Sequence, residues 1–167
     1  MITKEYLAGF IDGEGSISCY KRKDTRTKKG YTINSVFSIG TTNKEIMQEI
    51  KDLIKGKLFV KKNGLNAKVL YNVQIQNLET IRLFLENIKD NLIVKKPQAE
   101  LMIEYCISRQ NNKGKEYSKR EIQIAEKITE LNRRGRWINL WISALRFYNQ
   151  NKRITRLKNA KNDILPK

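Results

Sequence analysis

Hydrophobic positions in the first ninety residues alternate between two periods, which predicts helices and paired strands in a definite order. Residues 3–13 carry apolar side chains at helical spacing, with Thr3 as the expected N-terminal cap and Glu5 in the first turn. The period then becomes two, because Ile17 and Cys19 alternate with polar residues. The pattern indicates a helix that passes directly into a strand.

A second strand and a second helix follow the basic loop at residues 21–30. Thr42 and Glu45 have the spacing of a capping box for this helix, and Gly56 is expected to end it. The expected inner face of the strand consists of Ile33, Phe37 and Ile39. The expected apolar face of the helix consists of Ile46, Ile50, Leu53 and Ile54.

The same strand–strand–helix unit then recurs. Residues 57–62 predict a strand, Asn63 and Gly64 a turn, and a longer strand reaches Gln76 before Asn77 caps a helix. That helix is expected to bury Ile81, Phe84, Leu85 and Ile88. The sequence therefore predicts an α+β fold of order α-β-β-α-β-β-α, with an antiparallel sheet on helices and one polar sheet face.

C-terminal helices are expected beyond this core. Pro97 begins one helix, and Ser118 and Glu121 form a capping box for the next, which Gly135 ends. Packing residues are expected at Leu101, Met102, Tyr105, Cys106, Trp141, Leu145 and Tyr148. We expect residues 1–96 to form the core domain and residues 97–167 a helical extension with a basic tail.

The charge balance points to a polyanionic partner. The 167 residues include 34 Lys and Arg against 17 Asp and Glu, a net charge of +17. Such an excess is typical of nucleic-acid binding, and an anionic membrane surface is the weaker alternative. No apolar run is long enough to span a membrane, and no targeting segment is recognised at the N-terminus.

Histidine is absent, which excludes several mechanisms. There is no Ser–His or Cys–His nucleophile pair and no imidazole-bound zinc. Hydrolysis would need carboxylates, lysine or tyrosine, with a hard metal ion. The two cysteines, Cys19 and Cys106, lie in apolar segments and are expected to be buried reduced thiols. We therefore expect an intracellular location, in the cytoplasm or an organelle.

Two acids stand at the end of the first helix, where the helix dipole disfavours negative charge. Asp12 and Glu14 alternate with glycines, and a divalent cation bound there would offset the unfavourable charge. The alternative is that both acids are solvated turn residues. Gly9 and Gly13 lie on one side of the helix and would allow close approach of another backbone, although glycines also weaken a helix.

Leu7 to Gly15 read LAGFIDGEG, and this stretch resembles the signature of the LAGLIDADG homing endonucleases. The predicted element order is also similar to that family over residues 3 to 107, and the family's four-stranded antiparallel sheet is saddle-shaped. The motif occurs once, and family members with a single motif act as homodimers. The resemblance implies that two copies of the first helix pack together through Ala8, Gly9, Asp12 and Gly13.

The resemblance also implies an active site. Glu14 takes the place of the catalytic acid and direct metal ligand, the Gly13 carbonyl is a second ligand, and Asp12 is mainly structural. Magnesium is the expected ion, with manganese as the alternative. Lys95 matches a basic residue that polarises water and phosphate.

One family position is altered in this chain. The family's water-orienting Gln is replaced here by a segment in which Thr41 or Asn43 would substitute. A further basic position falls at Lys44, or is occupied by Glu45 instead.

The implied activity is that of an intron-encoded, site-specific homing endonuclease. It would hydrolyse phosphodiester bonds of double-stranded DNA in a long pseudo-palindromic site. The expected DNA-contacting side chains, which could otherwise be ordinary exposed strand polarity, are Ser18, Tyr20, Arg22, Thr32, Asn34, Ser38, Lys61, Asn72, Gln74 and Gln76.

Two other classes fit the charge. One is a catalytically silent nucleic-acid binder such as an intron RNA maturase, with intron RNA as its partner, and the other is a basic structural RNA-binding protein. Neither needs an acid on a surface that faces phosphates, so Glu14 discriminates between them and an endonuclease.

Overall fold

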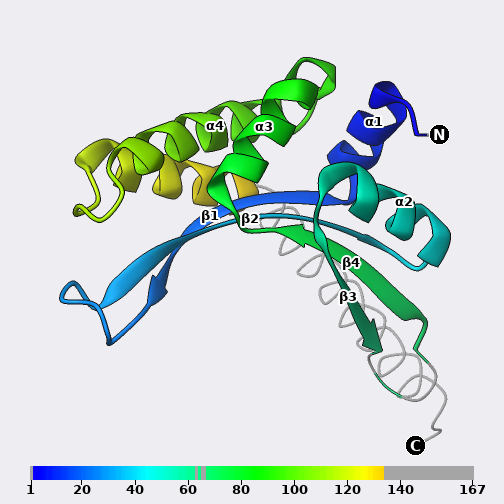
Figure 1. Cartoon of the computed structure of the whole chain (residues 1–167), viewed down its shortest axis with the longest axis horizontal. Helices are drawn as coiled ribbons and strands as arrows, with labels where there is room; N and C mark the ends of the chain where they lie inside the picture. The colour runs from blue at the N-terminus through cyan, green and yellow to red at the C-terminus, as the bar shows by residue number, and fades with distance from the viewer. Residues whose placement is uncertain (1, 63, 65–66, 134–167) are drawn as a thin grey trace, which may run out of the picture. The chain divides into compact units, whose positions relative to one another are not determined.

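The helices and strands of the computed structural model follow the predicted order (Figure 1). The structure describes residues 2–62, 64 and 67–133, and Met1–Leu131 form one compact unit. The elements are α1 (Lys4–Glu14), β1 (Gly15–Lys23), β2 (Tyr31–Thr41), α2 (Lys44–Ile54), β3 (Lys57–Lys62), β4 (Val69–Ile75), α3 (Leu78–Ile88), the short 3-10 helix η1 (Lys89–Asn91) and α4 (Lys96–Asn111). Residues 119–133 are also helical.

The four strands form one antiparallel sheet in the order β1-β2-β4-β3. The sheet is curved, and α1, α2, α3 and α4 lie on one side of it (Figure 1). Alternate residues of the strands therefore face either these helices or the opposite side. We call the opposite side the saddle face; it carries Ser16, Ser18, Tyr20 and Arg22 of β1, Thr32, Asn34, Val36, Ser38 and Gly40 of β2, Lys57, Phe59 and Lys61 of β3, and Leu70, Asn72 and Gln74 of β4.

The core lies between the sheet and the helices. Phe37 of β2 is fully buried and meets Phe84 of α3 edge to face, with 4.9 Å between the ring centroids. The same core continues past residue 96, because α4 contributes Met102 and the following helix contributes Ile128. The boundary expected between residues 96 and 97 therefore falls inside this unit.

Helix α2 departs from the prediction at both ends. Its cap is Asn43 and not Thr42, because the Asn43 side chain accepts a hydrogen bond from the Ile46 amide at 3.1 Å. The left-handed residue at its C-terminus is Lys55, with a φ of 53°, and not Gly56. The capping box expected at Thr42 and Glu45 is thus wrong, since the helix begins one residue later.

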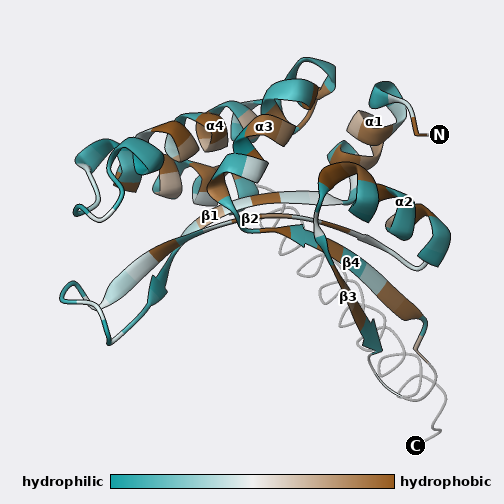
Figure 2. Cartoon of the chain, viewed as in Figure 1, coloured by the Kyte–Doolittle hydropathy of each residue, from teal (hydrophilic) through white to brown (hydrophobic). Residues whose placement is uncertain are grey.

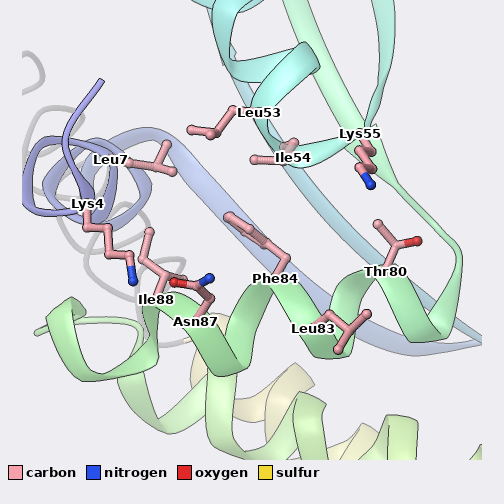
Figure 3. Close-up of a pocket in the computed structure, with 10 residues that line it drawn as sticks. All are labelled: Lys4, Leu7, Leu53, Ile54, Lys55, Thr80, Leu83, Phe84, Asn87 and Ile88. Carbon is pink, nitrogen blue, oxygen red and sulfur yellow. The ribbon is translucent and has the colours of Figure 1, made fainter. Parts of the chain in front are cut away.

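The core-facing side of α2 is also rotated from the expected one. Met47 is buried, whereas Leu53 is 56% exposed. Leu53 lines a pocket of about 370 Å³ between α1, α2 and α3, opposite Leu83 and Phe84 (Figure 3). The stripe of Met47, Ile50 and Ile54 meets the sheet, and Leu53 lies at its margin.

The second expected capping box is confirmed. The Ser118 amide donates to Glu121 Oε2 at 2.7 Å, and the Glu121 amide donates to Ser118 Oγ at 3.1 Å. Pro97 lies in the first turn of α4, and Thr3 caps α1 as predicted. Gly135, Trp141, Leu145, Tyr148 and most of the basic tail lie outside the described residues. Within the described part of the chain, no helix is both long and apolar enough to cross a membrane.

Candidate active site and nucleic-acid interface

Glu14 is fixed at the point where α1 becomes β1. It is the last residue of α1 and its side chain is exposed. The chain turns at Gly15, where a Cβ atom would lie 2.6 Å from the main-chain oxygen of Ile11. Any larger residue would have to push β1 away from the helix. Gly15 thus holds the carboxylate of Glu14 at one end of the sheet.

Asp12 joins α1 to the segment that precedes α4. Its carboxylate accepts hydrogen bonds from the backbone amides of Ile93 at 2.7 Å, Val94 at 3.1 Å and Lys95 at 2.9 Å. Burial alone would raise the pKa of the Asp12 carboxyl, but the amide donors outweigh it and hold the pKa below its ordinary value. This geometry makes Asp12 a structural residue of the junction.

Lys95 lies beside the same junction. Its ammonium donates a hydrogen bond to the main-chain oxygen of Asp12. Burial lowers the pKa of Lys95, although the Asp12 and Glu14 carboxylates act in the opposite direction. The fold therefore holds the Lys95 ammonium at the end of α1, two residues before Glu14, although the two residues are far apart in the sequence.

Thr41, Asn43 and Lys44, the residues expected near the position of the family's water-orienting Gln, lie at the end of the sheet where α1 meets β1. Ile39 is opposite Gly15 in the β1–β2 register, so Thr41 at the end of β2 lies close to the α1–β1 junction. Asn43 is committed to capping α2 through its side-chain oxygen. Lys44 is exposed as the first residue of α2. Among the described residues, no hydrogen bond or ion pair links these three to Glu14, and Thr41 is the least committed of them.

The oxygen atoms at the end of α1 suit a hard divalent cation but do not complete its ligand shell. Glu14 offers an exposed carboxylate, and Gly13 offers one of the last carbonyls of the helix. Over residues 2–62, 64 and 67–133, no group of three or more His, Cys, Asp or Glu side chains gathers in one place. Among the residues that the structure describes, the end of α1 offers one exposed carboxylate, that of Glu14.

One of the four residues of α1 predicted for the dimer interface is buried. Ala8 is 1% exposed and packs in the core of its own chain, so it is wrong as an interface residue. Gly9 and Gly13 are exposed, and a Cβ atom at either would meet nothing within 4 Å. Nothing described in the chain itself requires these two glycines.

Two aromatic rings lie on the same helix and were missed from the sequence. Tyr6 is 50% exposed, and its ring stacks on Phe10 with 6.2 Å between the centroids. Their spacing of four residues was the signal available. Ile93 and Val94, which bind Asp12, are also strongly exposed, at 86% and 66%. The exposed surface of α1 and of residues 93–94 is therefore more apolar than predicted.

The saddle face gathers the side chains expected to contact DNA. The register places Tyr20 opposite Asn34, Arg22 opposite Thr32, and Ser38 opposite Gln74. Ser18, Lys61 and Asn72 share this face, and Gln76 follows the end of β4. The prediction missed Ser16 and Lys57, which complete one row across the sheet with Ser38 and Gln74, and the apolar Phe59 and Leu70.

Comparison with known proteins assigns the chain to a family. A sequence model described as LAGLIDADG endonuclease matches residues 7–99, which begin at the first residue of the motif. The chain belongs to the LAGLIDADG endonuclease family. No curated protein matches the chain in sequence. The predicted α+β class and the single-motif type of this LAGLIDADG endonuclease are confirmed.

Solved structures of LAGLIDADG proteins share the fold. The archaeal intron-encoded homing endonuclease I-Vdi141I, complexed with DNA, is 27% identical with a TM-score of 0.64, over 77% of this chain and 82% of that chain. The homing endonuclease I-CvuI, in complex with the I-CreI target and Mg, is 20% identical with a TM-score of 0.63, over 77% and 80%. I-SmaMI bound to cleaved DNA is 18% identical with a TM-score of 0.60, over 77% of this chain but 43% of that chain.

Proposed function

We propose that this protein is a site-specific homing endonuclease of the intron-encoded type, which hydrolyses both strands of a long pseudo-palindromic DNA site with Mg²⁺. The observation that carries the proposal is that Asp12 holds Lys95, through hydrogen bonds from its amide and its ammonium, two residues before the exposed Glu14, at one end of a polar, basic saddle face. A binder without catalytic activity gains nothing from an exposed carboxylate there. Membership of the family and the DNA in the complex of I-Vdi141I support the same function.

The active enzyme in this proposal is a homodimer. Gly9 and Gly13 leave room for a second backbone along α1, and the Tyr6–Phe10 stack provides apolar surface beside them. Pairing across this surface would bring two copies of Glu14, and so two exposed carboxylates, together at the proposed metal site. The 43% coverage of I-SmaMI fits a chain that provides half of a larger enzyme.

The chain's own groups have distinct tasks in this mechanism. Glu14 and the Gly13 carbonyl would hold Mg²⁺, which when bound activates water and stabilises the charge of the phosphorane. Lys95 places a positive charge beside Glu14, where it stabilises negative charge that develops on the phosphate oxygens. Asp12 keeps the Lys95 backbone at the junction, and Thr41 is the residue best placed to orient the attacking water.

DNA cleavage by paired variants tests the proposal. The wild type is incubated with DNA of the intronless host locus, with Mg²⁺ and with a chelator. We expect double-strand cleavage only with Mg²⁺, loss of cleavage in Glu14→Gln with binding retained, and normal cleavage in Glu5→Gln, which changes an exposed acid at the other end of α1. Wild-type binding without cleavage would contradict the endonuclease and favour a maturase or another silent binder. Cleavage undiminished in Glu14→Gln would contradict the site.

A further inference from the structure

The polar saddle face contains an apolar patch that the proposed function has not used. Phe59 of β3 is 46% exposed and Leu70 of β4 is 36% exposed, and both lie on the saddle face by the β3–β4 register. Neither belongs to the hydrophobic core. Much of β3 and the start of β4 carry the hydrophobic colour in Figure 2. A ring in this position can contact an apolar group on bound DNA.

Phe59 lies directly opposite Asn72 in the register, and Gly40 lies opposite Asn72 on the other side. The row across three strands is therefore a glycine, an amide and an aromatic ring. A Cβ atom on Gly40 would lie 3.5 Å from the Cβ of Asn72 and 3.1 Å from the Tyr71 carbonyl. The absence of a side chain at Gly40 leaves Asn72 uncrowded on that side.

The amide of Asn72 is not committed within the fold. Its side-chain oxygen is buried and has no hydrogen-bond partner among the described residues. A buried acceptor without a donor is unfavourable. Because the Asn72 side-chain oxygen has no described partner, turning the amide toward a donor on a bound molecule gains one hydrogen bond and breaks none. Lys57 and Lys61 lie on the same face on either side of Phe59 along β3 and can hold phosphates nearby.

We propose that Phe59 and Asn72 form a subsite that selects an A·T base pair in the major groove of the target. Thymine offers the only apolar group on a major-groove base edge, its C5-methyl, and Phe59 contacts that methyl. Adenine offers the N6 donor and N7 acceptor that an Asn amide binds with two hydrogen bonds, and Asn72 supplies that amide. The subsite rests on the proposed function, since it requires DNA on the saddle face.

Base analogues that change single atoms test this subsite. Sites are first selected from randomised duplex DNA by binding to Glu14→Gln, and each selected thymine is then replaced by deoxyuridine, which lacks only the methyl. We expect one position in each half-site at which deoxyuridine weakens binding by about fourfold, the amount for one buried methyl. At the paired adenine, 7-deazaadenine should weaken binding through the loss of N7.

Matched substitutions in the Glu14→Gln background assign the effect to the two residues. Phe59→Ala should remove the deoxyuridine penalty at that position, and Phe59→Leu should keep it. Val60→Ala is the control, because Val60 is 63% exposed on the same strand but opposite Tyr71, on the other face, and it should also keep the penalty. Asn72→Ala should remove the 7-deazaadenine penalty.

The outcomes separate the subsite from the proposed function. If specific DNA is enriched but no deoxyuridine penalty depends on Phe59, the subsite is overturned and the endonuclease proposal stays intact. A penalty lost equally in Val60→Ala would also overturn it, because the effect would then follow from general loosening of β3. Failure to enrich any DNA would overturn the proposed function and the subsite with it.

Discussion

Asp12 and Lys95 bind each other through both backbone and side chain. The Lys95 amide donates to the Asp12 carboxylate at 2.9 Å, while the Lys95 ammonium donates to the Asp12 main-chain oxygen. Asp12 lies in the last turn of α1, and Lys95 immediately precedes α4. The pair therefore fixes the position of Glu14, which follows Asp12 by two residues, relative to the start of α4.

We expect Asp12→Ala to lower the free energy of unfolding by about 2 kcal/mol at pH 7, because three backbone amides lose a charged acceptor. The pKa of Asp12 is depressed in the folded chain, so its stabilisation is present above the unfolded pKa of about 4 and is lost as pH falls through the folded value. Urea unfolding measures the difference in free energy of unfolding between Asp12→Ala and the wild type, and this difference should be smaller at pH 3 than at pH 7. The control is Asp52→Ala, which changes an exposed acid on α2 and whose difference from the wild type should not depend on pH in this way. A difference for Asp12→Ala that is the same at both pH values would contradict the role of the Asp12 carboxylate.

Lys95→Met should reduce the rate of DNA cleavage about 100-fold under the proposed function, with DNA affinity changed far less. The reason is that its charge acts on the developing phosphate charge and not on ground-state binding. Lys96→Met is the matched control, since Lys96 is the next residue and pairs with Asp90 at 3.6 Å. Single-turnover cleavage and gel-shift binding measure the two effects. Equal losses in both variants would mean that the position of Lys95 beside Glu14 has no special part in catalysis.

Gly9→Leu should convert the proposed dimer to a monomer. The site has no neighbour within 4 Å in its own chain, so the added side chain leaves the single chain folded but keeps a second α1 at a distance. Sedimentation velocity would show the change in mass, and circular dichroism would show retained helix. Gln48→Leu, an exposed substitution on α2, should leave the dimer intact. A dimeric Gly9→Leu would place the interface elsewhere.

Glu121→Ala should lower the free energy of unfolding by about 3 kcal/mol or more. The side chain is fully buried, accepts from the Ser118 amide and lies 3.6 Å from the Arg109 guanidinium, which would be left without its acid. Ser118→Ala should cost about 1 kcal/mol through loss of the cap. Glu116→Ala removes an exposed ion pair with Lys29 and should change stability by less than about 1 kcal/mol. Guanidinium unfolding ranks the three variants, and an equal cost for Glu116 and Glu121 would contradict this order.

The two thiols should be unreactive in the native protein. Cys19 and Cys106 are free and buried, as the sequence predicted, and burial raises the pKa of each to about 12. Iodoacetamide at pH 8 should therefore label neither until denaturant is added. Thr25→Cys, in the exposed loop after β1, should react at once in the native state. Rapid native labelling of Cys19 or Cys106 would show that this part of the core opens.

The order of elements and the saddle face followed from the sequence because period and turn residues carry that information locally. Strand β3 was predicted with its observed bounds, Lys57–Lys62, and Asn77 caps α3 as expected. Helix α2 shows the limit of such reasoning. Thr42 and Asn43 are both good caps, and only the geometry of the strand end decides between them.

Some residues of the candidate site were predicted from the sequence, and others were misplaced or missed. Glu14 and Lys95 were chosen by resemblance. Only the tertiary fold shows that the Asp12 carboxylate binds the backbone amides of Ile93 and Lys95 and so holds Lys95 near the end of α1. Ala8 was misplaced because small residues suit a core as well as an interface, and a sequence pattern cannot tell which neighbour fills the space. Phe59 was passed over because only polar and charged side chains of the strands were expected to contact DNA.

The Asp12–Lys95 closure has a consequence for the order in which the protein is made. Amides 93–95 emerge from the ribosome long after α1, so a shorter nascent chain lacks the groups that hold Asp12. The Lys95 ammonium takes its place near Glu14 only when the chain up to residue 95 has been synthesised and has folded back onto the first helix. Such long-range closure is slow compared with local helix formation. Translation products that end before residue 95 therefore lack the assembled site, and under the proposed function they are unable to cleave DNA.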